Sequence, residues 1–160
     1  MIDITLDSNV LVYAFVPPIH KNELKRTDWE NLHINAKKIY ESVIREKHCL
    51  ILPFAVIMEV ASVISLLAGK EEYGKDAALE IEDCAKIVLF DSDIKERALD
   101  YAIKIKAGGF DNLIAITSIL YGTTLITNDK PFYNKLLQFI DEYQFDVKLF
   151  RDLNPGDLKL

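Results

Sequence analysis

The chain has 160 residues, of which 50% are hydrophobic and 28% charged, and its formal net charge is −6. This length and composition indicate a single soluble domain with a continuous core. No apolar run is long enough to span a membrane and the N-terminus lacks a basic secretion signal, so we expect a cytoplasmic protein. The negative charge argues against broad electrostatic binding of nucleic acid, but it does not exclude an enzyme whose acidic residues bind cations.

The N-terminal segment is predicted to contain a strand, a short helix and a loop. Residues 2–6 alternate apolar and polar side chains, which favours a strand. A helix is expected from Ser8, as its N-cap, to Phe15, before a pair of prolines that cannot continue it. The polar residues 20–31 are predicted to form a loop, within a possible insertion over residues 17–31.

Two helices and a strand are expected in the next segment. Apolar residues recur at helical spacing over residues 31–47, which predicts an amphipathic helix. Residues 49–52 are a compact apolar strand that Pro53 stops. Residues 54–68 are apolar on nearly every side and therefore predict a buried helix. A further helical turn or two is expected over residues 77–84.

The C-terminal half is predicted to alternate strands and helices. Strands are expected at residues 87–90, 123–127 and 147–150, the last at an edge of the sheet. Helices are expected after a cap at Asp91 or Ser92, from Asp111, and over residues 132–140. Short apolar strands alternating with helices favour a parallel sheet that is covered on both faces.

Four acidic residues lie inside or at the ends of apolar elements, where a carboxylate is costly unless it is paired or bound to a cation. Asp7 and Asp129 end predicted strands, Asp111 begins a predicted helix, and Glu59 lies within an apolar one. Their sequence neighbourhoods contain no basic residue except Lys130. Ligands of parallel sheets bind beyond the carboxyl ends of the strands, so convergence of these acids would form a divalent-metal site.

Each acid also has a simpler interpretation. Asp7 is compatible with a strand end or a cap of the helix that follows, and Asp111 and Asp129 with helix N-caps. Glu59 cannot be a cap, because apolar residues precede and follow it within the helix. It would then be protonated, paired, or turned to solvent beside Ser62. The histidines show no ligand-like spacing, and the two cysteines are expected to be free and buried.

The ordered set of acidic motifs resembles that of PIN domains. The motifs are Asp7-Ser8-Asn9 after a strand, Glu59 within a helix, Asp111-Asn112 at a helix start, and Thr127-Asn128-Asp129 after a strand. The compact size is similar to that of the VapC-type toxin ribonucleases of toxin–antitoxin systems. The resemblance implies a single PIN-like nuclease domain over residues 1–160, with an α/β, Rossmann-like three-layer sandwich of four to five parallel strands and helices on both faces.

The resemblance also implies a metal-dependent endoribonuclease. Its four acids would be catalytic and would bind one or two Mg²⁺ or Mn²⁺ ions, which prefer oxygen ligands. Ser8, Asn9 and Thr127 would orient the carboxylates or waters. RNA is the implied substrate, and a small antitoxin protein and a second copy of the chain are the implied partners. The alternatives are an RNA-processing PIN nuclease without a toxin role and a non-catalytic PIN-like interaction module.

Overall fold

The chain forms a single parallel sheet flanked by helices. The computed structural model describes residues 2–19 and 22–153. Within these ranges five parallel strands pair in the order β3-β2-β1-β4-β5. Their bounds are β1 Ile2–Leu6, β2 His48–Pro53, β3 Ala85–Val88, β4 Thr124–Thr127 and β5 Asp146–Leu149. The predicted α/β fold is confirmed, and the last strand is an edge strand as expected.

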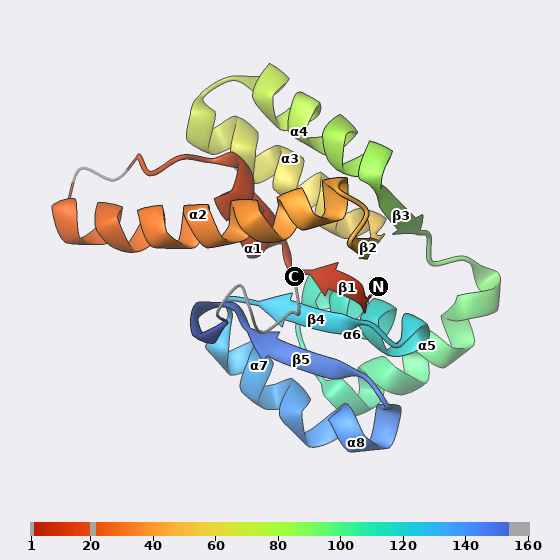
Figure 1. Cartoon of the computed structure of the whole chain (residues 1–160). Coiled ribbons are helices and arrows are strands. Elements are labelled where there is room, and N and C mark those ends of the chain that lie inside the picture. Colours follow the sequence, from red (N-terminus) through yellow and green to blue (C-terminus); the bar gives the residue numbers. More distant parts are fainter. Residues whose placement is uncertain (1, 20–21, 154–160) are drawn as a thin grey trace.

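Helices cover the sheet on both sides. Their bounds are α1 Ser8–Phe15, α2 Glu23–Ile44, α3 Phe54–Ala68, α4 Glu71–Cys84, α5 Ser92–Ile105, α6 Gly109–Tyr121, α7 Lys130–Leu136 and α8 Ile140–Tyr143. The chain runs outward from β1 to β3 and then returns to β4 and β5 on the other side of β1. Because parallel crossovers are right-handed, this reversal places the later helices on the opposite face. Figure 1 shows α1 to α4 above β1, α6 behind β1 and β4, and α7 and α8 below β5.

The core lies at the centre of the sheet. Ile4, Leu50 and Leu125, on three neighbouring strands, are fully buried. Thr5 is buried with them, and its hydroxyl donates to the carbonyl oxygen of Ile51 at 3.0 Å. The hydrogen bond satisfies a hydroxyl group whose burial would otherwise cost free energy.

In the described part of the chain, no helix has the length and apolar character needed to cross a membrane.

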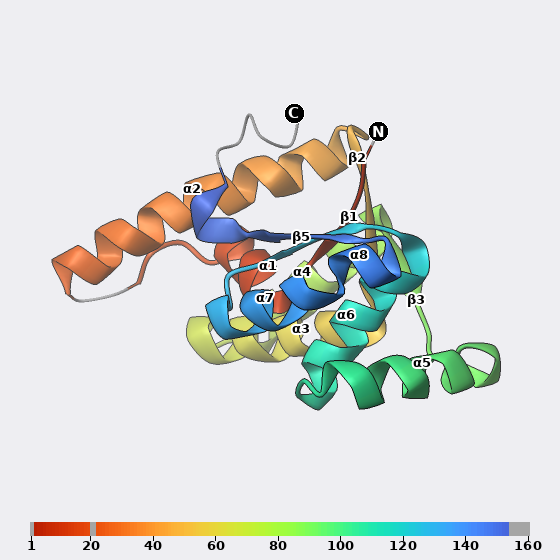
Figure 2. The same cartoon turned by 90° about the horizontal axis from the view of Figure 1, so that it is seen from below.

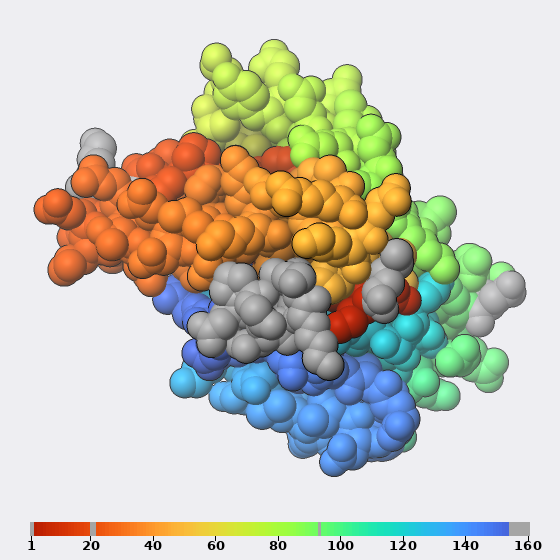
Figure 3. Space-filling model, in the orientation of Figure 1, coloured from red at the N-terminus to blue at the C-terminus, as the bar shows by residue number. Residues whose placement is uncertain are grey.

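The predicted loop over residues 20–31 is wrong. Residues 20 and 21 lie outside the described residues, and α2 begins at Glu23, capped by the Asn22 side chain, which accepts from the Lys25 N–H at 3.2 Å. Trp29 and Leu32 continue the apolar stripe of α2 toward its N-terminus, while the polar residues between them face solvent. Figures 1 and 2 both show this half of α2 extending beyond the sheet, and Figure 3 shows it standing out from the molecular surface.

Helix α3 has the predicted bounds but not the predicted burial. Val56, Val60 and Ile64 are buried, whereas Leu66 is 80% exposed and Met58 is 49% exposed. One side of the helix packs on α1, α4 and the sheet, and the other side remains on the surface. Although nearly every side of α3 carries apolar residues, only one side of the helix is buried.

The remaining differences concern the ends of elements. The cap position of α1 is occupied by Asp7, so Ser8 is the first helical residue and not the N-cap. Helix α4 is longer than predicted, β3 ends at Val88 rather than at residue 90, and the helix expected over 132–140 is interrupted by a 3-10 turn at Leu137–Phe139. Both cysteines are free thiols, as expected, and each is only partly buried.

Helices α3 and α4 approach each other closely at Gly74. A Cβ atom added there would lie far inside van der Waals distance of the Ala61 carbonyl oxygen and the Ser65 hydroxyl. The Ala61 carbonyl is backbone and cannot rotate away, so a larger residue must separate the two helices.

We therefore expect Gly74→Ala to destabilise the fold by about 2 kcal/mol, in the range of overpacked cores. Urea denaturation would measure the free energy of unfolding. Gly109→Ala is the matched control, because a Cβ at this other helical glycine meets nothing within 4 Å. Equal stability of the two variants would contradict the close approach of α3 and α4.

Candidate active site

Asp7 is the buried centre of the candidate site. It follows β1, and its backbone N–H donates to the Ile126 carbonyl oxygen of β4 at 2.9 Å. Only 5% of the residue is exposed. Its carboxylate accepts from the Thr127 hydroxyl at 2.5 Å, from the Asn9 amide at 2.8 Å and more weakly from the Ser8 hydroxyl at 3.3 Å. The residues expected to orient carboxylates are therefore all in contact with this one.

Thr127 and Asn9 also connect Asp7 to the segment that carries the last acid. The Thr127 hydroxyl donates to Asp7 and accepts from the backbone N–H of Asp129 at 3.0 Å. The Asn9 side-chain oxygen accepts from the backbone N–H of Asn128 at 3.2 Å while its amide nitrogen donates to Asp7. A hydroxyl and an amide side chain can each both donate and accept hydrogen bonds. Each of these two side chains donates one bond to Asp7 and accepts one from a backbone N–H. These hydrogen bonds fix the residues that follow β1 relative to those that follow β4.

Of the three acids for which a capping role was considered, only Asp129 caps a helix with its side chain, since Asp7 stands at the N-cap position of α1 without such a bond. Asp129 is the N-cap of α7, and its carboxylate accepts from the Phe132 N–H at 2.8 Å. Asp111 is not a cap, because Gly108 occupies the cap position of α6 and Asp111 lies in the first helical turn. The positive end of the helix dipole favours a carboxylate at this position. Asp129 is exposed, and its bond to the Phe132 N–H uses only one carboxylate oxygen, Oδ1.

Glu59 lies in the middle of α3 and is half-buried. It lines a small cavity together with Ser8 and Asn9, the two residues that contact Asp7. None of the salt bridges found within residues 2–19 and 22–153 involves any of the four acids. Glu59 lies close enough to Asp7 and Asp111 for its charge to act on both of their carboxyl groups.

Electrostatic interactions connect all four carboxylates. The pKa of Asp7 is raised above its usual value, first because burial removes water from the charged form and then because Asp111 and Glu59 repel it. The pKa of Asp111 is raised by burial and by repulsion from Asp129 and Glu59. The structure thus gathers the four acids that the sequence singled out, from four separate elements.

A basic residue that the sequence analysis did not select lies beside two of these acids. Lys135, Asp111 and Asp129 line a cavity of about 130 Å³. The Lys135 ammonium group donates to the Lys106 carbonyl oxygen at 2.7 Å and lowers the pKa of Asp111 by its charge. Lys135 lies six positions beyond Asp129 in α7, and only its place in a basic last turn was visible in the sequence.

The donor set suits a hard divalent cation. Mg²⁺ and Mn²⁺ prefer carboxylate oxygens and usually keep several waters. Among the described residues, however, no group of three or more His, Cys, Asp or Glu side chains is arranged so that it could hold a metal ion. The carboxylates would therefore have to move closer together to share one cation.

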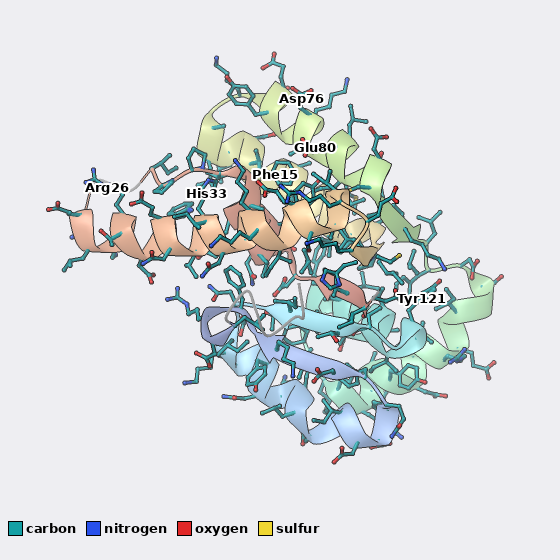
Figure 4. The ribbon with its side chains drawn as sticks, viewed as in Figure 1. Phe15, Arg26, His33, Asp76, Glu80 and Tyr121 are labelled. Atoms are coloured by element: carbon teal, nitrogen blue, oxygen red, sulfur yellow. The ribbon has the colours of Figure 1, made fainter. Side chains whose placement is uncertain are left out.

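A separate apolar groove of about 540 Å³ lies away from the acids, where α1 ends against α3 and α4. Phe15, Ile64 and Leu67 contribute to its apolar lining. Asp76 and Glu80 of α4 add negative charge to it, and Figure 4 shows both of these residues and Phe15 on this part of the molecule.

The comparisons with known proteins agree with this fold. The family model described as the PIN domain matches residues 4–135, a range that contains all four acids. The chain therefore belongs to the PIN domain family, which confirms the predicted resemblance. No curated protein matches the chain significantly.

Two solved structures are similar to the chain over nearly its whole length. One is VapBC-1 from nontypeable Haemophilus influenzae, with a TM-score of 0.61, 15% identity, and coverage of 94% of this chain and 100% of the other. The second is VapBC2 from Rickettsia felis bound to a DNA fragment from its promoter, with a TM-score of 0.57, 15% identity, and coverage of 92% and 98%. At this identity the likeness establishes the fold.

The raised pKa of Asp7 predicts how its charge affects stability. A carboxyl group whose pKa is higher in the folded than in the unfolded state favours folding when protonated, and this stability is lost as pH rises through the folded value. In metal-free protein, Asp7→Asn should thus raise the free energy of unfolding at pH 7 by about 1 kcal/mol. The asparagine oxygen can still accept from Thr127 and Asn9.

The gain should shrink as pH falls toward 3.8, the ordinary pKa of an aspartate, where Asp7 of the wild type is largely neutral. Urea denaturation in EDTA at several pH values would measure it, with the exposed Asp141→Asn as control. A gain that is independent of pH, or a less stable Asp7→Asn variant, would contradict the assignment of a buried, destabilising charge to Asp7.

Proposed function

We propose that the protein is a metal-dependent endoribonuclease that hydrolyses RNA phosphodiester bonds, and that it is the toxin of a toxin–antitoxin pair. One observation carries the proposal: four carboxylates from separate elements lie close enough to be linked by mutual repulsion, and none of them forms a salt bridge among the described residues. Such an arrangement costs stability, and a bound cation offsets that cost. Membership of the PIN domain family supports the nuclease class.

Asp7, Glu59, Asp111 and Asp129 would hold one or two Mg²⁺ or Mn²⁺ ions. A bound ion of this kind supplies a more acidic water as nucleophile and neutralises charge on the phosphate. The protein contributes the orientation of the ligands. Thr127 and Asn9 donate to the Asp7 carboxylate and so favour its ionised form and limit its rotation.

Lys135 would contact the substrate. Its ammonium group lies beside Asp111 and Asp129 and is only partly buried, so it can pair with a phosphate oxygen next to the scissile bond. A charge-assisted hydrogen bond of this type is stronger than a neutral one. The contact would offset part of the repulsion between an acidic site and an anionic substrate.

The antitoxin would bind in the apolar groove between α1, α3 and α4. Both similar solved structures carry names of two-component VapBC assemblies, which supports a protein partner for this chain. The groove combines an apolar lining with Asp76 and Glu80, so it suits an apolar segment that carries basic side chains. The homodimer expected from the sequence is a further proposal, which sedimentation analysis of the purified chain tests.

Removing a ligand should abolish cleavage without unfolding the protein. We expect Asp7→Asn and Asp111→Asn to lower the rate of cleavage of single-stranded RNA in Mg²⁺ or Mn²⁺ by more than about 100-fold, because each removes a charged ligand. Asp141→Asn should retain the wild-type rate, and EDTA should stop the reaction in all variants. Unchanged cleavage by both site variants would refute the proposed function.

The Thr127 hydroxyl should control metal affinity through Asp7. Thr127→Val removes the 2.5 Å hydrogen bond to the carboxylate and should weaken Mg²⁺ or Mn²⁺ binding by about 10- to 100-fold. Thr127→Ser keeps a hydroxyl and should stay close to the wild type. Titration calorimetry would measure both affinities, and equal binding by the valine and serine variants would exclude a positioning role for this hydroxyl.

A further inference from the structure

A cavity of about 220 Å³ opens directly beside the acids. At one end it is polar, where Ser8, Asn9 and Glu59 line it. At the other end it is aromatic and apolar, where Tyr13 and Trp29 line it with two valines. The two ends of this cavity are thus chemically different, and only the polar one belongs to the group of residues around Asp7.

Helix geometry explains how the two ends are connected. Asn9 and Tyr13 are four residues apart on α1, and Glu59 and Val63 are four residues apart on α3, so each pair lies on one helix face. The polar and aromatic ends are therefore separated by one helical turn, or about 6 Å. The separation between the two ends of the cavity is comparable with the distance from the phosphate of a nucleotide, across the ribose, to its base.

The aromatic side chains are held in place but not covered. The rings of Tyr13 and Trp29 meet edge to face at 5.7 Å between centroids, and Tyr13 also stacks on Phe150 at 6.4 Å. The Tyr13 carbonyl oxygen lies 2.7 Å from the imidazole Nδ1 of His33, which connects α1 to α2 (Figure 4). Tyr13 and Trp29 are both only partly buried. An ordinary core pair would be closed off, whereas these rings border an open cavity.

We propose that this cavity is a subsite for one nucleobase of single-stranded RNA, with Tyr13 and Trp29 as its stacking surface. A base bound there would place its own phosphate toward Asp7 and Glu59. The inference rests on the proposed function, since it assumes that the acids act on RNA. Base stacking on aromatic rings contributes about 1–3 kcal/mol per base and tolerates different bases. A chain of net charge −6 gains little from general attraction to phosphates, so stacking would supply much of its affinity.

Trp29 is the single tryptophan of the chain and therefore reports on its own site. We expect AMP and UMP, which contain no phosphodiester bond, to change its fluorescence in a saturable way in the presence of Mg²⁺. Ribose 5-phosphate, which has no base, should not. Tyr13→Leu should weaken AMP binding by about 5- to 100-fold. Tyr73→Leu is the control, because Tyr73 is a 52% exposed tyrosine on α4 that does not line this cavity.

Cleavage kinetics provide a second readout. Trp29→Leu should raise KM for a short single-stranded RNA by a similar factor and change kcat by less than about twofold, because stacking is equally present in the bound substrate and the transition state. Trp29→Phe keeps an aromatic face and should restore KM. Thermal denaturation of each variant would establish that it remains folded, and loss of kcat alone in folded Trp29→Leu would overturn the inference.

The outcomes separate the subsite from the proposed function. Absence of a fluorescence response to AMP and UMP, while the wild type still cleaves RNA, would overturn the base subsite and leave the nuclease intact. An equal response to ribose 5-phosphate would also overturn it, since it would show a phosphate site only. Tyr13-dependent binding of AMP by a protein that cleaves no RNA would support the subsite and refute the nuclease.

Discussion

The hydrogen bond from the Thr127 hydroxyl to the buried carboxylate of Asp7 connects the two strands on which the candidate site is built. Parallel pairing aligns Leu6 of β1 with Ile126 of β4, so the residues that follow each strand meet at the same edge of the sheet. Thr127 then binds the backbone of Asp129, and Asn9 binds that of Asn128. The position of the last acid thus depends on the first, and both depend on the register of two central strands.

At the carboxyl ends of β1 and β4, the charged carboxylates of the candidate site lower the stability of the fold. The fold places Asp7 in a nearly waterless position beside two other carboxylates, which raises its pKa and works against folding when it is charged. The neighbouring donors offset only part of that cost. A bound cation would stabilise carboxylates in such surroundings, which is the physical reason for the metal-dependent chemistry that we propose for them.

Helix α2 gives the site a feature that the four acids alone do not have. Its N-terminal half extends beyond the sheet, and Trp29 brings this extension back to Tyr13 beside the cavity. The helix is anchored on α1 by this aromatic contact and by His33. Trp29 belongs to the stretch that the sequence suggested was a polar loop or insertion, and in the structure it lines the same cavity as Ser8, Asn9 and Glu59.

The sequence by itself determined the α/β class, the approximate positions of the strands and of most helices, and four acids as candidate site residues, because apolar periodicity and costly carboxylates are local signals. It also singled out Ser8, Asn9 and Thr127. It missed the start of α2, since a mostly exposed helix has the composition of a loop and only Trp29 and Leu32 mark its buried side. It could not choose between cap and site for Asp111, because Gly108 and Asp111 are both compatible with a helix start. Only the tertiary structure placed Tyr13 and Trp29 along the cavity that Glu59 also lines, and Lys135 beside Asp111. Their positions depend on how several helices pack around the end of the sheet, which no local sequence pattern specifies.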